Sequence, residues 1–413
     1  RLLIKFKPRE EEKMKIVISI LGILVVMAIM YLLSASKKDV PLKTVLKALG
    51  IQFIIAFILV KFPLGRLAIE KVSDVVTQVL TYGMDGISFV FGSLANSSAP
   101  TGSIFGIQTL GNIIFISALV GALYYLGILG FIVKVIGTVV GKLLGTSKVE
   151  SFVAVANMFL GQTESPILIS KYLMSMTESE IMVVLISGMG SMSATIIGGY
   201  VALGIPMEYL LIASALVPFG SIAISKLLLP ELETVENIEN VSIDNKGDNE
   251  NLIGAIAEGA MNGLQSALAI GASLIAIIGL VALVNGILGI FGITLQQIFS
   301  YIFSPIGFLM GLDGAEILRA GQLLGEKLVL NEFVAFQTLG EVIQTLDYRT
   351  GLVMAISLCG FANISSMGIC ISGISALCPE KRKVLSKLAF KAMIGGFAVS
   401  VLSAMIVGLI TLI

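Results

Sequence analysis

The sequence predicts an all-α membrane protein that crosses the bilayer several times, and three observations lead to this fold class. Of its 413 residues, 56% are hydrophobic and only 13% are charged, whereas soluble proteins carry about 25% charged residues. The mean hydropathy is +0.99. Long apolar stretches with few internal charges recur along the chain. A chain with so few polar side chains cannot cover a water-facing surface, which excludes a soluble or disordered protein.

Eight apolar stretches are expected to be transmembrane helices, because a helix needs about 20 apolar residues to cross the bilayer core. They lie at residues 16–34, 45–62, 104–140, 181–207, 210–225, 259–312, 350–379 and 392–413. The third stretch would form a helix of about 55 Å, so it must tilt, bend or project. The sixth stretch is too long for one span and too short for three.

Two further apolar segments, 151–172 and 328–339, are expected to be re-entrant hairpins. Each has a glutamate near its middle, Glu164 in the first and Glu332 in the second, with polar or glycine neighbours. Such segments would make poor lipid-facing helices. Irregular backbone at membrane depth is tolerated only where it is buried in protein or lines water, which favours hairpin tips enclosed by the rest of the protein.

Basic residues predict the orientation, because cytoplasmic loops are enriched in lysine and arginine. They gather at residues 37–47, 142–148 and 381–387. All three groups are cytoplasmic if the chain starts and ends on the outer side. The polar stretch 231–251 falls on the cytoplasmic side too, and is expected to be a flexible acidic loop. Residues 1–13 oppose this orientation because they are also basic; Met14 is a plausible natural start, so we expect a remnant of expression or a disordered N-terminus there, and no cleavable signal peptide is evident.

The order of segments is repeated along the chain. Each expected hairpin is followed by an uncharged span interrupted by small and hydroxyl residues, at 188–195 and at 359–366, and then by a further span. With the orientation above, the first hairpin opens to the cytoplasm and the second to the outside. An inverted repeat with two broken helices near the midplane is typical of secondary transporters.

The residues around the two glutamates indicate the kind of solute. An ionised carboxylate in hydrocarbon costs about 2.5 kcal/mol or more, so an intramembrane glutamate is a candidate functional residue. The neighbours are amides and hydroxyls and not arginine, which suits a neutral, hydroxyl-rich molecule and a small cation better than an anion. The alternative is a structural role in which Glu164 and Glu332 pair with distant lysines.

Several other functions are excluded or disfavoured. The net charge is zero and there is no histidine, which argues against nucleic-acid binding and excludes a histidine-based metal site or proton relay. The chain has no phosphate-binding Gly-x-x-x-x-Gly-Lys-Ser/Thr motif, so ATP-driven transport is disfavoured. Without histidine the usual nucleophile–base pair is missing, and an enzyme is a weak alternative. The three cysteines, Cys359, Cys370 and Cys378, are expected to be small buried side chains.

Three ordered motifs stand at the expected hairpin tips and helix breaks. They are Gly161-Gln-Thr-Glu-Ser-Pro166, Asn331-Glu-Phe-Val334 and Cys359-Gly-Phe-Ala-Asn-Ile-Ser-Ser366. In this order and spacing, residues 14–413 resemble the concentrative nucleoside transporter family. The resemblance implies a homotrimer in the bacterial inner membrane, each protomer with eight spans, two opposed hairpins and interfacial helices. It also implies an elevator mechanism, in which a transport domain slides past a trimeric scaffold.

The resemblance divides the chain into scaffold and transport parts. Residues 14–145 would be mainly scaffold, with the first three spans and an interfacial helix around 66–98. Residues 146–230 would form the first transport repeat, with hairpin 1 and spans 4 and 5, followed by the loop 231–251. Residues 252–312 would hold an interfacial helix, span 6 and an external helix. Residues 313–413 would form the second transport repeat, with hairpin 2 and spans 7 and 8.

The resemblance also implies a nucleoside site shared by both repeats. Contact with the base is implied for Gln162, Thr163, Glu164, Ile196 and Phe361. Ribose binding is implied for Glu332, Asn363 and Ser366. This agrees with the chemistry of the residues, because an amide can pair with a base edge while a carboxylate, an amide and a hydroxyl can bind two sugar hydroxyls.

The family's sodium site is similar to four positions of this chain. They are Asn157 through its side chain and backbone, the Leu160 carbonyl, the Ser191 hydroxyl and the Met192 carbonyl. Oxygen ligands at a broken helix suit a hard cation. Because side-chain oxygens are present at Asn157 and Ser191, sodium coupling is favoured over proton coupling, and no other cofactor is implied.

The sequence therefore predicts a sodium-coupled symporter that imports nucleosides such as uridine. A proton-coupled nucleoside symporter is the main alternative. An elevator transporter for another solute, such as an amino acid or dicarboxylate, is disfavoured because the hairpin motifs contain no arginine. A channel or a nucleoside receptor would differ from a coupled carrier by failing to accumulate solute against a gradient.

Overall fold

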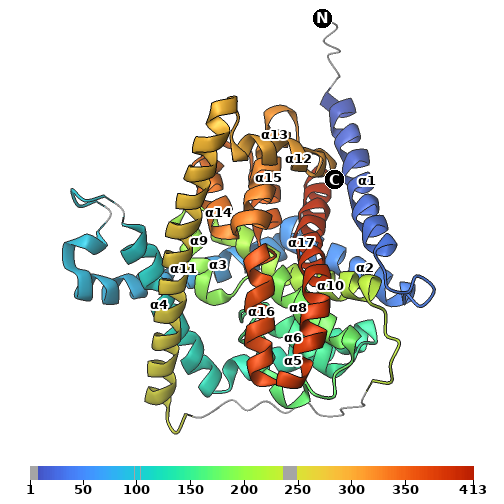
Figure 1. The fold of residues 1–413 in the computed structure, drawn as a ribbon, viewed down its shortest axis with the longest axis horizontal. Helices are drawn as coiled ribbons and strands as arrows, with labels where there is room; N and C mark the ends of the chain where they lie inside the picture. Colours follow the sequence, from blue (N-terminus) through green and yellow to red (C-terminus); the bar gives the residue numbers. More distant parts are fainter. Residues whose placement is uncertain (1–7, 97, 103, 236–248) are drawn as a thin grey trace, which may run out of the picture.

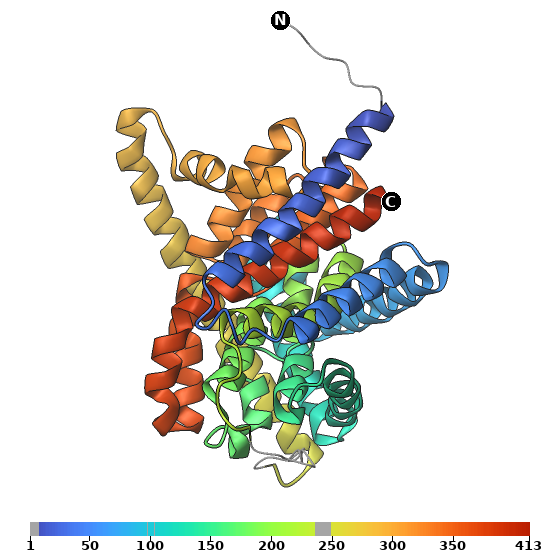
Figure 2. The same ribbon diagram turned by 90° about the vertical axis from the view of Figure 1, so that its right-hand side faces the viewer.

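The computed structural model describes residues 8–96, 98–102, 104–235 and 249–413, and these residues form helices and turns without a strand. The first half contains α1 (Pro8–Leu32), α2 (Leu42–Val60), α3 (Pro63–Phe91), α4 (Phe105–Tyr125), α5 (Ile128–Leu144), α6 (Lys148–Ala156), α7 (Ser165–Leu168), α8 (Glu178–Gly190), α9 (Ala194–Ala202) and α10 (Met207–Leu228). The second half contains α11 (Leu252–Leu288), α12 (Leu295–Leu309), α13 (Gly314–Gly325), α14 (Glu332–Gly340), α15 (Tyr348–Leu358), α16 (Ile364–Leu377) and α17 (Arg382–Leu412). The all-α prediction is confirmed for these described residues (Figures 1 and 2).

Seven helical stretches within the described residues are long and apolar enough to cross a membrane. They comprise α1, α2, α4, α8 with α9, α10, α11 and α17, some with an adjoining turn. The pair α12 and α13, which is bent by 116°, would add an eighth if it were one span. The predicted span at 350–379 is divided into α15 and α16, each too short to qualify alone. The span count, predicted as eight, therefore depends on how broken helices are counted.

The two stretches that were too long for one span are each divided into two helices. Residues 104–140 fall on α4 and α5, separated at Gly127, whose φ of 76° is left-handed and favours glycine. Residues 259–312 fall on α11 and α12, with Gly292 between them at a φ of 70°. Of the three possibilities predicted for the first stretch, to tilt, bend or project, the structure shows a break between two helices.

The start of α1 and the end of α17 lie at the same end of the molecule (Figure 1). There Lys15 forms an ion pair with Asp313. Arg349 ties α15 to the same region, because its guanidinium donates to the carbonyl of Gly311 at 2.9 Å and to that of Gly408 at 3.3 Å. The chain thus begins and ends its described helices on one side, as the predicted orientation requires.

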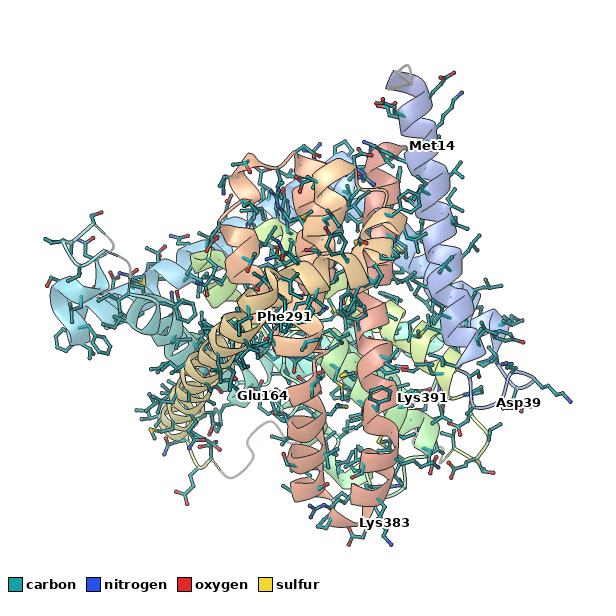
Figure 3. The ribbon with its side chains drawn as sticks, turned by 45° about the horizontal axis from the view of Figure 1, so that its top comes forward. Met14, Asp39, Glu164, Phe291, Lys383 and Lys391 are labelled. Carbon is teal, nitrogen blue, oxygen red and sulfur yellow. The ribbon has the colours of Figure 1, made fainter. Side chains whose placement is uncertain are left out.

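Basic groups predicted to be cytoplasmic lie toward the opposite end. Figure 3 shows Asp39 and Lys383 far from Met14. Lys381 donates to the carbonyl of Met176 at 2.6 Å, which places the start of α17 beside the start of α8.

The first helix starts upstream of the predicted apolar stretch. Helix α1 begins at Pro8, so residues 8–13 are helical; that residues 1–13 are a remnant of expression or a disordered N-terminus stays a prediction. A helix can extend past the apolar stretch because the acidic Glu10 and Glu11 in its first turn favour the positive helix end. Residues 1–7 lie outside the described residues, as do 236–248 of the predicted polar loop.

Helix α3 occupies the region in which an interfacial helix was predicted, around 66–98. Pro63 suits the first turn of a helix. Because α3 contains several charged residues, it is not among the helices apolar enough to cross a membrane. Gly65 allows the start of α3 to fold back against α2, since an added Cβ would lie 2.0 Å from the carbonyl oxygen of Ile58. Its location at a membrane interface stays a prediction.

Helices α4 and α11 pack along each other and form a layer of their own (Figures 1 and 2). Their backbones approach closely at glycines: an added Cβ at Gly259 would lie 2.6 Å from the carbonyl oxygen of Ser117, and one at Gly263 would lie 2.9 Å from that of Ile113. Small residues permit such close approach between membrane helices. Most other side chains of α11 are exposed or half-buried, so α11 joins the rest of the protein mainly through α4.

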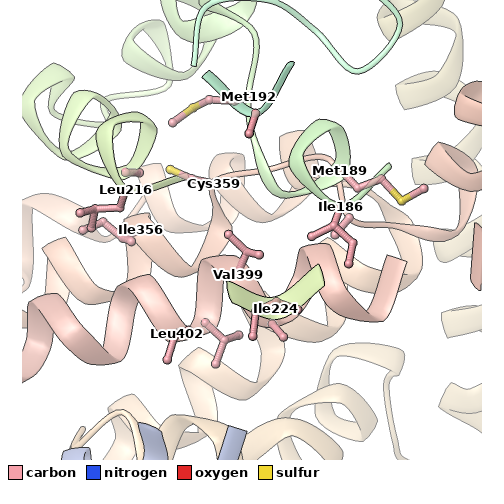
Figure 4. Close-up of a cluster of buried hydrophobic side chains, with 14 of the residues drawn as sticks. Ile186, Met189, Met192, Leu216, Ile224, Ile356, Cys359, Val399 and Leu402 are labelled. Carbon is pink, nitrogen blue, oxygen red and sulfur yellow. The ribbon is translucent and has the colours of Figure 1, made fainter. Parts of the chain in front are cut away.

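The buried centre is formed by α8, α10, α15 and α17. Figure 4 shows side chains from all four helices packed together: Ile186, Met189, Leu216, Ile224, Ile356, Val399 and Leu402. None of these side chains is exposed. The three cysteines are free and buried, as predicted. This centre is rigid by its close packing, and it holds the ends of α8 and α15, where both helix breaks begin.

Candidate functional site

The first bent segment, residues 148–172, enters and leaves the protein at the same end. A capping box formed by Ser147 and Glu150 starts α6, and the chain turns back between α6 and α7. Beyond the segment, Glu180 of α8 accepts a hydrogen bond of 2.5 Å from the Ser147 hydroxyl. The two ends are therefore tied together, which leaves Gln162 in the turn at the tip.

The second bent segment, residues 314–345, has the same form and starts from the opposite end (Figure 1). Helix α13 continues into a π-helical turn, Glu326–Leu330, and α14 begins at Glu332. The hydrogen bond from Arg349 to the carbonyl of Gly311 ties the ends of this segment together. Glu332 thus lies at the tip, between the two arms.

Two helix breaks meet beside these tips. The first separates α8 from α9 and the second separates α15 from α16. The backbone N–H of Phe361 in the second break donates to the carbonyl of Ser191 in the first, at 3.1 Å. Gly360 permits this contact, because its φ is 107° and an added Cβ would lie 2.8 Å from the carbonyl carbon of Gly190. The breaks therefore form one junction.

Replacing Gly360 by alanine is expected to lower the melting temperature of the detergent-solubilised protein by about 3 °C or more, because both φ and the Gly190 backbone resist a Cβ. Thermal unfolding followed by circular dichroism or light scattering would measure this change. Gly368→Ala is the matched control, since Gly368 lies on α16 with nothing within 4 Å of an added Cβ. Equal melting temperatures for the two variants would contradict the role of Gly360.

The predicted ribose-binding residues are brought together at this junction. The Glu332 side chain, which is only 6% exposed, accepts a hydrogen bond of 3.0 Å from the Asn363 amide and one of 3.3 Å from the Tyr200 hydroxyl. The Asn363 oxygen accepts from the backbone N–H of Ser366 at 2.9 Å and caps α16. Because every group is held by another, the carboxylate has a fixed orientation.

Gln162 joins the first tip to the second broken helix. Its amide N–H donates to the Ser366 hydroxyl at 3.3 Å, and its oxygen accepts from the Cys370 thiol at 3.3 Å. Beside it, Thr163 packs against α16, where an added Cβ at Gly373 would lie 2.7 Å from the Thr163 methyl group. Gln162, which was predicted to bind the base, thus contacts Ser366, which was predicted to bind the ribose.

Glu164 faces a cavity of about 290 Å³. Its carboxylate accepts a hydrogen bond of 3.0 Å from the backbone N–H of Gly161. The cavity lies between the first bent segment and the layer of α4 and α11, with lining residues that include Tyr124, Leu160, Thr195, Glu258 and Asn262. Its volume is close to the lower end for small-molecule sites. Glu332 and Asn363 do not line it, so the predicted base group is divided between this cavity and the junction.

The other two predicted base contacts lie on the elements around the junction. Ile196 is buried in the first turn of α9, and Phe361 is partly buried within the second break. Ile196 thus follows the first break, whereas Phe361 lies inside the second.

The residues predicted to bind sodium come from the first bent segment and from the first break, and all are buried: Asn157 and Leu160 in the segment, Ser191 and Met192 in the break. The Asn157 amide donates to the Ser187 hydroxyl of α8 at 2.9 Å, and its oxygen accepts from the Ser165 hydroxyl at 2.8 Å. The Ser191 hydroxyl, at the end of α8, donates to the Gly188 carbonyl at 3.2 Å. These oxygens are neutral, and the C-terminal end of α8 carries partial negative charge. The donor set therefore fits a monovalent cation.

Two residues that contact this site lie outside the sequence motifs: Tyr200 donates to Glu332, and Lys327 donates to a carbonyl at the end of α15. Ser165, which lies inside the first motif but was not predicted to bind a ligand, donates to Asn157. Lys327 lies at the edge of the apolar segment 328–339, and a charged residue at such a position is a signal that could have identified it. Tyr200 stands 132 positions from its partner, so no local pattern could have linked the two.

Three family models match consecutive parts of the chain. The model "Na+ dependent nucleoside transporter N-terminus" matches residues 21–94, "Nucleoside recognition" matches 106–207, and "Na+ dependent nucleoside transporter C-terminus" matches 209–408. Together these matches extend from α1 to α17.

Relatives and a solved structure are similar over nearly the whole chain. An uncharacterized transporter of Haemophilus influenzae is 41% identical, over 96% of this chain and 98% of its own. The nucleoside permease NupC of Helicobacter pylori is 35% identical, over 95% of this chain and 97% of its own. The structure of CNTnw in an inward-facing substrate-bound state is 37% identical, with a TM-score of 0.92 over 97% of this chain and 98% of that one.

Proposed function

Because the chain belongs to the family of Na+ dependent nucleoside transporters, we propose that it is a sodium-coupled symporter that imports nucleosides such as uridine across the bacterial inner membrane. Membership of this family makes it a membrane permease and not an enzyme. In this proposal the nucleoside and the sodium ion are both cargo, and no further cofactor takes part.

The hydrogen-bonded pair of Glu332 and Asn363 carries the proposal. A carboxylate accepts hydrogen bonds from ribose hydroxyls, and an amide can donate and accept. Gln162 and Ser366, bonded to each other at the same junction, would supply an amide for the base and a hydroxyl for the sugar. None of the motifs 161–166, 331–334 and 359–366 contains an arginine, so the set suits a neutral molecule better than an anion.

Sodium would bind where the first bent segment meets the first helix break. The side-chain oxygens of Asn157 and Ser191 and the carbonyls of Leu160 and Met192 would surround it. By joining the end of α6 to the end of α8, the ion would order the first tip and with it Gln162. A membrane potential supplies about 2.3 kcal/mol per charge per 100 mV, which supports accumulation of the nucleoside.

We propose that the bent segments are two opposed re-entrant hairpins in an inverted repeat, with eight spans in each protomer of a homotrimer. Their ends are tied at opposite ends of the protein and their tips meet between them, as a midplane site requires. The layer of α4 and α11 would belong to the scaffold of an elevator mechanism. The cavity beside Glu164 lies between this layer and the first tip, where the two parts would slide past each other.

Uptake of radiolabelled uridine into proteoliposomes tests the proposal. With an inward sodium gradient, uridine is expected to accumulate transiently above its equilibrium level, because the ion runs down its gradient together with the nucleoside. With choline in place of sodium at the same pH, uptake should fall to that of protein-free liposomes. Unlabelled uridine should compete with the label, and amino acids or dicarboxylates should not.

Two other outcomes would change the proposal. Accumulation driven by a proton gradient alone would retain nucleoside transport and transfer the coupling to a buried glutamate, Glu164 or Glu332. No uptake under any gradient, from protein shown to be folded, would contradict nucleoside transport.

A further inference from the structure

A fully buried lysine stands at the second helix break. Lys327, with no exposed surface, lies in the π-helical turn of the second bent segment. Its ammonium group donates to the carbonyls of Ser357 at 2.9 Å and Cys359 at 3.1 Å, and to the Ser400 hydroxyl at 2.5 Å. Among the ion pairs of the described residues, none includes Lys327. Its direct contacts are therefore neutral oxygens, and the Glu332 carboxylate acts on its charge only at longer range.

These oxygens resemble the ligands of a monovalent metal ion. Ser357 and Cys359 are at the end of α15, where the helix dipole places partial negative charge. The ring of Phe397 adds a favourable surface for a cation, with its centroid 5.6 Å from the ammonium nitrogen. Burying a charge without a carboxylate is costly, and an apolar side chain would fill the same space without that cost. The presence of a lysine at this position therefore indicates a role that requires positive charge.

The first half of the chain places its sodium-binding groups at the corresponding position. Asn157, at the end of the first arm of the first bent segment, donates to Ser187 of α8, 30 positions later. Lys327, at the end of the first arm of the second bent segment, donates to Ser357 of α15, also 30 positions later. Both contacts tie the bent segment to the helix that breaks beside its tip.

We propose that Lys327 is a tethered cation that does for the second repeat what sodium does for the first. It fixes the end of α15 and so positions Asn363 and Glu332, without itself touching the nucleoside. The second half of the site is then permanently formed, and only the first half depends on an ion from solution. This inference rests on the proposed function for its binding test, but not for its stability test.

The test compares Lys327→Met, which keeps the volume but removes the charge, with Lys327→Ala, which also leaves space. Lys134→Met is the matched control, because Lys134 is exposed on α5. At saturating sodium, Lys327→Met is expected to weaken uridine binding by at least about tenfold in calorimetry, since charge-assisted hydrogen bonds to three oxygens are lost. Lys134→Met should bind as the unchanged protein does. Wild-type-like binding by Lys327→Met would overturn the proposal, because a space-filling role survives that change.

Rescue distinguishes a missing cation from a missing contact. Methylammonium, which fits the space left in Lys327→Ala, should raise its melting temperature and restore part of its uridine binding, whereas tetramethylammonium should not. Lys327→Met should respond to neither, because its side chain occupies the space. If methylammonium and tetramethylammonium changed the melting temperature of Lys327→Ala equally, the proposal would be overturned. The melting temperature can be measured without a nucleoside. If the wild-type protein bound no nucleoside, the proposed function would be contradicted, but the effect of the two cations on the melting temperature would still test the role of Lys327.

If the Lys327 variants do not fold, Ser400→Ala tests whether Lys327 acts as a tethered cation. It removes one of the three oxygens around the ammonium and little volume. Uridine binding weakened by about threefold or more would support the tethered cation, relative to Ser372→Ala on the exposed face of α16. Unchanged binding would overturn it.

Discussion

Uridine binding is expected to weaken by about tenfold or more when Glu332 is replaced by glutamine, because hydrogen bonds to a charged group contribute about 1.5–3 kcal/mol. Glutamine keeps the volume of the side chain, but it replaces one of two acceptor oxygens by a donor. The carboxylate accepts from both Tyr200 and Asn363, so a donor NH2 group would oppose one of these donors. Calorimetric titration of uridine at saturating sodium would measure the loss.

The control for this prediction is a carboxylate on the same segment that points away from the junction. Glu341→Gln serves, because Glu341 is exposed at the end of α14, and it should bind uridine as the unchanged protein does. Uridine and a 2′,3′-dideoxynucleoside should differ strongly in affinity for the unchanged protein and much less for Glu332→Gln. Equal binding of both sugars by the unchanged protein would remove Glu332 from the ribose site.

Withdrawal of sodium is expected to have the second large effect. Uridine affinity should fall about tenfold or more in choline at constant pH. Sodium would bind the ordered form of the first tip more tightly than the disordered form, and so would favour the form that binds uridine. Ser191→Ala should raise the sodium concentration needed for half-maximal uridine binding by about tenfold, from the loss of one ligand. Uridine affinity at saturating sodium should change little.

Ser193→Ala is the matched change for Ser191→Ala. Ser193 lies in the same break and caps α9, so its removal should lower stability by about 1 kcal/mol without changing the sodium requirement. A sodium requirement that shifts equally in both variants would show that general loosening of the break, and not a lost ligand, is responsible. Uridine affinity that is the same in sodium and choline would contradict sodium coupling itself.

Most of the helical layout could be predicted because the bilayer sets the length of a span. Length alone showed that residues 104–140 had to tilt, bend or project, and the structure divides them at Gly127. The exact break was beyond prediction, since a glycine inside a long apolar stretch can either continue a helix or end it. The helical start at Pro8 was missed because hydropathy marks where a helix is apolar and not where it begins.

The site was predictable to the extent that its motifs are local. Asn363 and Ser366 are neighbours in one motif, and the structure joins both to residues of the other two motifs. The separation of Glu164 from Gln162 was not predictable, because two side chains in one turn can point to opposite sides. Lys327 and Tyr200 were missed for a different reason: their partners come together only through packing of distant helices.

The direct bond between Gln162 and Ser366 has a consequence for the way the protein would cycle. A carrier that only moved when loaded could exchange one nucleoside for another but could not deliver them in net amounts. Here protein groups alone can link the two halves that a nucleoside would otherwise bridge, so the substrate replaces an existing link and does not create a new one. In the proposed cycle, a closed form would therefore be available for the return of the empty protein as well as for delivery of the nucleoside.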